Sequence, residues 1–215
     1  MNDAPTPGVA HFLAQTDTVG WVLFVILMAM SVASWTVILV RLILQLAQKR
    51  RSRAFRQELE TQSSLADFVG TRPADPLEEP FSWLMAELSK ADRSAEALAQ
   101  RAQTLMDRIA ARLENGLTLL GTVASTAPFV GLFGTVWAVY HALVAIGMTG
   151  SAGLEQVAAP VGEALIMTGL GLAVAIPAVV GYNLIVRGNR LLLSDLNGFA
   201  QELIEDFTLA GSRRR

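Results

Sequence analysis

The chain has 215 residues, of which 52% are hydrophobic and 17% charged, below the roughly 25% charged residues usual in soluble domains. It contains no cysteine, which excludes disulfides, thiolate metal sites and cysteine nucleophiles, and its two histidines are too few and too far apart to indicate a metal site. The net charge of −2 hides an asymmetry, because all 17 Lys and Arg residues lie within 41–112 and 187–215. These features are typical of a membrane protein.

The N-terminal part predicts one membrane crossing. Residues 1–18 are polar and lack the basic start and cleavage site of a signal peptide, so we expect a periplasmic N-terminal segment. The charge-free run 19–40 is long enough to cross a bilayer and is the predicted transmembrane helix 1. A basic cluster begins at Arg41, which by the positive-inside rule indicates the cytoplasmic side. A nucleic-acid or anionic-lipid patch is the alternative interpretation of this cluster.

Residues 41–116 are predicted to form a cytoplasmic helical domain, interrupted once by the Gly- and Pro-rich stretch 70–80. Good helix formers without Gly or Pro fill 81–115, so we predict one uninterrupted helix that runs on toward the next apolar stretch. Its apolar stripe could dock a partner, or it could pack on the chain's own C-terminal helix or on a neighbouring copy, and we favour packing. The stripe consists of Leu98, Ala102, Leu105, Ile109 and Leu113.

The charge-free run 115–154 contains the predicted transmembrane helix 2 (117–148) and part of a periplasmic turn (149–157). Small residues recur in it at helical spacing and predict close packing against another helix. Pro128 is expected to kink this helix, a feature that membrane helices tolerate. The small residues are Gly131, Gly134, Thr135 and Ala138.

Transmembrane helix 3 is predicted at 158–186 and contains a second expected kink at Pro177, followed by a cytoplasmic C-terminal helix and basic tail at 187–215. The predicted fold class is therefore an all-α integral membrane protein with three transmembrane helices and long cytoplasmic helical extensions. The N-terminus is expected to be periplasmic and the C-terminus cytoplasmic. We expect no enzyme activity, cofactor or metal, because no catalytic pair or ligand cluster occurs in the spans.

Glu163 is the sharpest candidate functional residue. An ionisable side chain within or beside a membrane helix is costly and indicates an ion pathway. Alternatively, Pro160 begins the helix and a glutamate in its first turn simply favours the helix dipole. His141 could pair with Glu163, or be satisfied by backbone groups or lipid headgroups.

Spacing about the turn predicts that Thr135 and Thr168 lie at the same depth on antiparallel helices, although either hydroxyl could simply bond back to its own helix. Small residues form one packing face of the third span: Ala164, Thr168, Gly171, Ala175 and Ala178. A second face is predicted to carry Glu163 above a bulky apolar wall formed by Met167, Leu170 and Val174. Such a wall makes a poor aqueous pore, so another polypeptide would have to supply further polar groups.

Three stretches in order resemble one family. They are Ala127–Trp137 (APFVGLFGTVW), Val157–Ile166 (VAAPVGEALI), and Thr168–Leu172 with Ala175–Val179. Together they resemble the ExbB/TolQ/MotA family of proton-channel subunits, most closely its ExbB branch, with TolQ second. Two departures are Ala138, where the motif usually has glycine, and Met167 with Gly169, which replace small alanines around Thr168.

The resemblance implies a homo-oligomer, with five copies around a central pore that holds transmembrane helices of an ExbD-type subunit with a membrane aspartate. It implies use of the proton motive force at the bacterial inner membrane to drive a TonB-type protein, for outer-membrane uptake of iron-siderophores. It also implies that Glu163, Thr135 and Thr168 form the proton pathway. The alternatives are a TolQ-like subunit for envelope integrity, or a non-conducting membrane scaffold.

Overall fold

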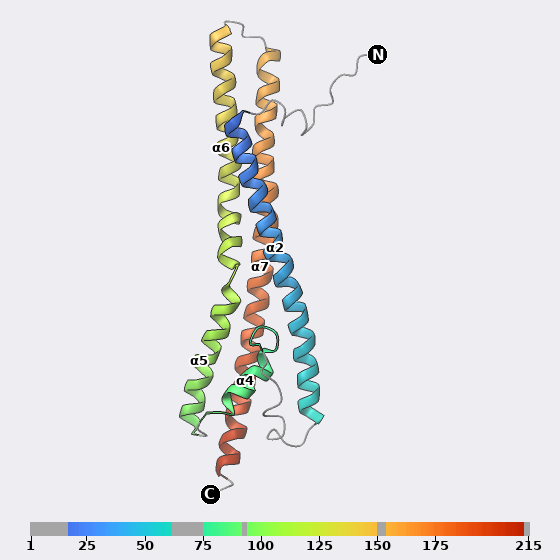
Figure 1. The fold of residues 1–215 in the computed structure, drawn as a ribbon, viewed down its shortest axis with the longest axis vertical. Helices are drawn as coiled ribbons and strands as arrows, with labels where there is room; N and C mark the ends of the chain where they lie inside the picture. Colours follow the sequence, from blue (N-terminus) through green and yellow to red (C-terminus); the bar gives the residue numbers. More distant parts are fainter. Residues whose placement is uncertain (1–16, 62–74, 92–93, 150–153, 213–215) are drawn as a thin grey trace. The chain divides into compact units, whose positions relative to one another are not determined.

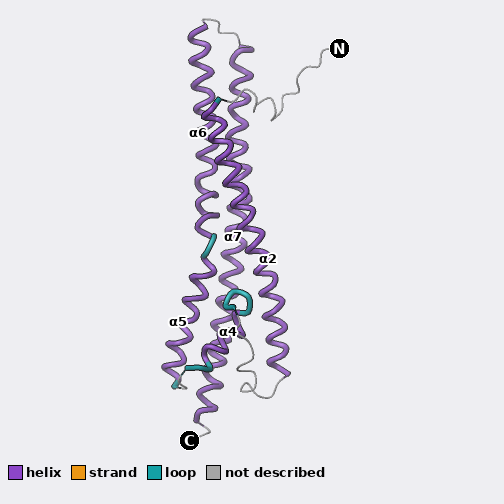
Figure 2. The backbone as a smooth tube through the Cα atoms, in the orientation of Figure 1, coloured by secondary structure: helices purple, strands orange, loops and turns teal. Residues whose placement is uncertain are grey.

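The computed structural model describes residues 17–61, 75–91, 94–149 and 154–212, but not the side chains of residues 56, 58–61, 149, 154–160, 163 and 209–212. Every regular element in these ranges is a helix (Figures 1 and 2). The helices are α2 (Thr18–Thr61), α4 (Pro80–Leu88), α5 (Ala95–Glu114), α6 (Leu117–Thr149) and α7 (Leu154–Ser212). Three helical stretches, Thr18–Phe55, Ala95–Met148 and Ala164–Thr208, are long and apolar enough to cross a membrane. The predicted all-α class with three spanning helices is confirmed.

The chain divides into two compact units: Met1–Ile38 with Thr118–Tyr182, and Leu39–Leu117 with Asn183–Arg215. In the first unit, the apolar core joins α2, α6 and α7. Its buried members are Leu23, Leu27, Val123, Ala127, Met167, Val174, Ala175 and Ala178.

This core corrects the predicted bulky wall below Glu163. Met167 is only 2% exposed and Val174 only 9%, so both side chains pack inside the protomer. The physical reason lies in the facing glycine of α6, because a Cβ built on Gly134 would lie 3.0–3.2 Å from carbons of the Met167 side chain. Gly134 therefore leaves the space that Met167 fills.

In the second unit, the apolar stripe of α5 packs against α4 and the C-terminal part of α7. The stripe residues, including Leu105 and Ile109, share one buried cluster with Phe81 of α4 and Phe199 of α7. Two ring contacts extend it, since Phe199 lies 5.4 Å from Phe81 and 6.0 Å from Phe55 of α2 between ring centroids. The prediction that the stripe packs on the chain's own C-terminal helix is confirmed.

The prediction of one uninterrupted helix across 81–115 is wrong at two places. The first break precedes Ser94, which is extended (φ −73°, ψ 137°) and accepts a hydrogen bond from the Ala97 N–H at 3.3 Å. This is an N-cap, which starts a new helix although no Gly or Pro is present. The second break is at Asn115–Gly116, where Gly116 has φ 83°. Glycine tolerates this left-handed conformation just beyond a helix end.

The carbonyls exposed at the end of α5 are bonded by a side chain from α2. The Arg41 guanidinium donates to the carbonyl of Arg112 at 3.2 Å and also to that of Asn115. A cation at a helix C-terminus also interacts favourably with the helix dipole. Arg41 therefore caps α5 from outside the helix.

A buried amide of α7 completes the same cap. Asn189, 7% exposed, donates from Nδ2 to the carbonyl of Leu113 at 3.0 Å and accepts at Oδ1 from Gln45 Nε2 at 3.0 Å. The same Gln45 nitrogen donates to the carbonyl of Ile185 at 3.0 Å. We call Arg41, Gln45 and Asn189, with the carbonyls that they bond, the polar junction.

Both prolines that are expected to kink their helices lie inside continuous helices, Pro128 within α6 and Pro177 within α7. The expected kinks stay predictions. The residues assigned to the third span and to the C-terminal segment share α7, a single helix of 59 residues.

Candidate functional site

The helices α6 and α7 approach most closely where glycines face each other. A Cβ built on Gly131 would lie 2.7 Å from the carbonyl oxygen of Met167 and 3.0 Å from the Cα of Gly171. A Cβ on Gly171 would likewise lie 2.7 Å from the carbonyl oxygen of Ala127. Because real Cβ atoms do not fit at such distances, only glycine permits this contact. Backbone meets backbone here, which fixes the side chains on either side of it.

This contact brings two hydroxyls together. Thr135 lies one turn beyond Gly131 on α6 and is 8% exposed, and Thr168 lies just before Gly171 on α7. The Thr168 hydroxyl donates to the Thr135 hydroxyl at 3.4 Å, and the Thr135 hydroxyl donates to the Leu132 carbonyl at 2.7 Å. The two hydroxyls therefore meet at one level, and one of them also bonds back to its own helix. Their part in proton movement stays a prediction.

The structure describes Ala138 and Ala175 fully but gives only the backbone of Glu163. Ala175 is 4% exposed in the apolar core, and Ala138 is half-buried on α6. The backbone of Glu163 lies in α7, five residues before Thr168, but its side chain lies outside the described residues. The expected pairing of His141 with this carboxyl therefore stays a prediction.

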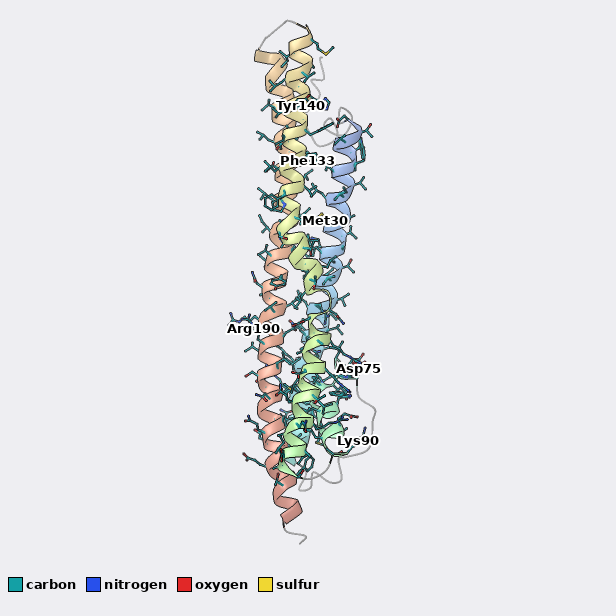
Figure 3. All side chains as sticks on the ribbon, turned by 90° about the vertical axis from the view of Figure 1, so that its left-hand side faces the viewer. Met30, Asp75, Lys90, Phe133, Tyr140 and Arg190 are labelled. Atoms are coloured by element: carbon teal, nitrogen blue, oxygen red, sulfur yellow. The ribbon has the colours of Figure 1, made fainter. Side chains whose placement is uncertain are left out.

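Aromatic rings surround His141 on α6. Its ring centroid lies 4.5 Å from that of Trp137 and 5.5 Å from that of Tyr140, and Phe133 lies 6.4 Å from Trp137. Phe133 and Tyr140 are 52% and 59% exposed and can be followed along α6 in Figure 3.

Sequence analysis did not identify Asp17 as a partner of these aromatic side chains. The indole Nε1 of Trp137 donates to the Asp17 carboxylate at 2.6 Å. The signal was present, since an aspartate directly before a long apolar helix is a typical N-cap. The prediction treated 1–18 only as a polar segment, and no sequence spacing relates Asp17 to a residue 120 positions away.

The α6–α7 contact offers hydrogen-bonding groups in an apolar setting. Among the described residues, no group of three or more His, Asp or Glu side chains could hold a metal ion. A hydroxyl can both donate and accept hydrogen bonds, so the two threonines can link the helices by hydrogen bonds in an otherwise apolar interface.

Comparison with known proteins agrees with this character. The sequence profile of the MotA/TolQ/ExbB proton channel family matches residues 74–197, more than half of the chain. The chain belongs to this family. The matched range contains both threonines, Glu163 and the paired glycines of the α6–α7 contact, and the resemblance stated from the motifs is confirmed.

Within the MotA/TolQ/ExbB family, the relatives found include both branches. The "Biopolymer transport protein ExbB" of Xanthomonas campestris is 38% identical over 97% of this chain and 91% of its own length. The ExbB of Neisseria meningitidis is 36% identical over 84% of this chain and 88% of its own. The "Tol-Pal system protein TolQ" of Haemophilus influenzae is 34% identical over 83% of this chain and 84% of its own. With its three apolar helices, this proton-channel family member is a multi-pass membrane protein.

Proposed function

We propose that the chain is an ExbB-type subunit of an inner-membrane proton channel. With an ExbD-type single-span subunit, it couples the proton motive force to a TonB-type protein that serves outer-membrane uptake of iron-siderophores and similar cargo. Support comes from the two ExbB relatives named above, from Xanthomonas campestris and Neisseria meningitidis, which combine higher identity with longer coverage than the TolQ of Haemophilus influenzae. The partners, the homo-oligomer and the cargo belong to this proposal.

One observation carries the proposed mechanism: the pair of hydroxyls held together in a charge-free interface. Thr135 and Thr168 lie 3.4 Å apart beside the backbone-to-backbone contact of α6 and α7, and Thr168 is partly exposed. In an apolar environment each hydroxyl needs a hydrogen-bonding partner. The pair can therefore bond a proton carrier supplied by a second polypeptide, such as the membrane aspartate of an ExbD-type subunit.

Glu163 is the proposed protonatable group on α7 itself. A carboxyl in an apolar setting is pushed toward its neutral form, so it binds a proton readily and releases it to a charged partner. We propose that protons pass between Glu163 and the partner's aspartate, with the two threonines holding the hydrogen bonds on the way.

The charge distribution supports the proposed orientation. Lys and Arg are missing from 1–40 and from 113–186, and are concentrated in the segments assigned to the cytoplasm. By the positive-inside rule this favours an N-terminus and an α6–α7 connection in the periplasm and a C-terminus in the cytoplasm.

The test is complementation in a host that lacks its own ExbB-type subunit. Wild type, Glu163→Gln and Glu163→Asp are produced at matched membrane levels with the cognate small subunit, and uptake of a labelled ferric siderophore is measured. We expect uptake with wild type, none with Glu163→Gln, and partial uptake with Glu163→Asp. Full uptake with Glu163→Gln would refute the role of this carboxyl.

The TolQ-type function is the second candidate, because TolQ relatives match most of the chain at 34% identity. It is favoured if wild type fails to restore siderophore uptake but restores envelope integrity in a host lacking TolQ. The scaffold alternative is weaker, because the apolar stripe on which it relied is buried inside the protomer.

A further inference from the structure

The carboxylate of Asp17 makes two hydrogen bonds in different directions. Its Oδ1 accepts the backbone N–H of Gly20 at 2.8 Å, which caps the first turn of α2. Its Oδ2 accepts the indole N–H of Trp137 on α6 at 2.6 Å. The cap needs only one oxygen, so the second bond is a separate, charge-assisted tie between α2 and α6.

This tie lies on the opposite side of α6 from the threonine pair. Trp137 follows Thr135 by two residues, which at about 100° per residue places the two side chains about 200° apart around the helix. Thr135 is bonded by Thr168 of α7, whereas Trp137 is bonded by Asp17 at the start of α2. The same segment of α6 is therefore held from both sides.

The apolar contacts of α2 in this unit lie further along the helices. Leu23 and Leu27 of α2 share one buried cluster with Val123 and Ala127 of α6. Apolar contacts are non-directional, whereas a hydrogen bond fixes the orientation of its donor and acceptor. The glycine contact and the threonine bond hold α6 against α7, and the Asp17–Trp137 bond adds a directional contact between α6 and α2.

The Asp17 carboxyl remains ionised under ordinary conditions. Burial raises its pKa, but the hydrogen bonds from Trp137 and Gly20 together hold the pKa below its usual value. The acceptor is therefore present throughout the neutral range. Asp17 is also the only Asp, Glu, Lys or Arg between residues 4 and 40 of the sequence.

We infer that Asp17 is a positioning residue for the proton pathway: through Trp137 it fixes the rotation of α6 and so keeps Thr135 directed at Thr168. The inference rests on the proposed function. Loss of the tie permits α6 to turn, which separates the hydroxyls and lowers proton-coupled uptake without removing any group of the pathway.

Two variants break the tie in different ways. Asp17→Asn keeps a good N-cap but places an amide N–H₂ beside the indole donor, and Trp137→Phe keeps an aromatic ring but removes the donor. Each variant is expected to lower siderophore uptake about tenfold at an unchanged membrane level, because a charge-assisted hydrogen bond contributes a free energy on this scale. The double variant is expected to be no worse than either single one, because both remove the same bond. Asp17→Glu, which keeps the charged acceptor, is expected to recover part of the uptake.

The matched controls are Asp3→Asn, which removes the other acid of the N-terminal segment, and Trp21→Phe, which removes an indole from α2. Both are expected to leave uptake unchanged. Wild-type uptake with Asp17→Asn or Trp137→Phe, or additive losses in the double variant, would overturn the inference. If wild type restores uptake and Glu163→Gln does not, a result that overturns the inference leaves the proposed function standing. If wild type itself restores no uptake in this host, the proposed function has failed.

Discussion

Substituting Gly171 by alanine tests the contact on which the threonine pair depends. The new Cβ would lie 2.7 Å from the Ala127 carbonyl oxygen and 3.0 Å from the Gly131 Cα, and neither backbone atom can move alone. The helices must separate by roughly 0.7 Å to bring the closest of these contacts to an ordinary distance. Overpacking of this kind costs about 1–3 kcal/mol. The 3.4 Å bond between the threonine hydroxyls is already long and would be lost.

The assay is thermal unfolding of the purified complex in detergent, with siderophore uptake measured in parallel. In a chain of this size 1–3 kcal/mol corresponds to a midpoint lower by about 2–12 °C. Gly169→Ala is the matched control, because it makes the same change two residues away in α7, where no atom lies within 4 Å of the new Cβ. It is expected to stabilise the helix by up to about 1 kcal/mol. If the two variants unfold at the same temperature, the close approach of α6 and α7 is wrong.

Three further predictions concern the second unit. Leu105→Ala removes a fully buried side chain from the α4–α5–α7 core and should cost about 2–5 kcal/mol in a thermal or denaturant unfolding measurement. Asn189→Ala removes the donor to the Leu113 carbonyl and leaves the Gln45 amide bonded to the Ile185 carbonyl alone, which should cost about 1–3 kcal/mol. Asn197→Ala, at an exposed position of the same helix, should be nearly neutral. The pKa of Glu87 is lowered from its ordinary value of 4.5, first by its hydrogen bond to Lys90. Its ion pairs with Lys90 and Arg101 therefore stabilise the fold fully above pH 4.5, and this stabilisation is lost as the pH falls through the pKa of Glu87 in the folded chain. Between pH 7 and pH 3, wild type should therefore lose up to about 1 kcal/mol more stability than Glu87→Gln does, and equal losses would contradict the assignment.

The structural features that follow from periodic sequence patterns were predicted correctly. The stripe through Leu105 and Ile109 repeats at helical spacing and packs on α7 as predicted, because burial of such a face is what stabilises a helix of this kind. The three apolar helices follow from length and hydropathy alone. The match in level between Thr135 and Thr168 also followed from counting residues along two antiparallel helices.

Features set by single side chains were missed. The break before Ser94 depends on one hydroxyl, and the break at Gly116 depends on one residue with positive φ, so neither alters the average composition of the region. An Asn-Gly pair after a helical pattern is a termination signal that the prediction overlooked. The burial of Met167 depended on the space above Gly134 in a different helix, and no pattern within α7 contains that information.

The polar junction also determines an order of events during biosynthesis. Arg41 is synthesised 71 and 74 residues before the two carbonyls that it bonds, and Asn189 follows the Leu113 carbonyl by 76 residues. At a synthesis rate of about 5–20 residues per second, about 4–14 s pass between the synthesis of Arg41 and that of the end of α5. A similar time passes before Asn189 of α7 is synthesised. A chain truncated before α7 therefore exposes an incomplete helix cap, which gives cellular quality control a defined feature to detect.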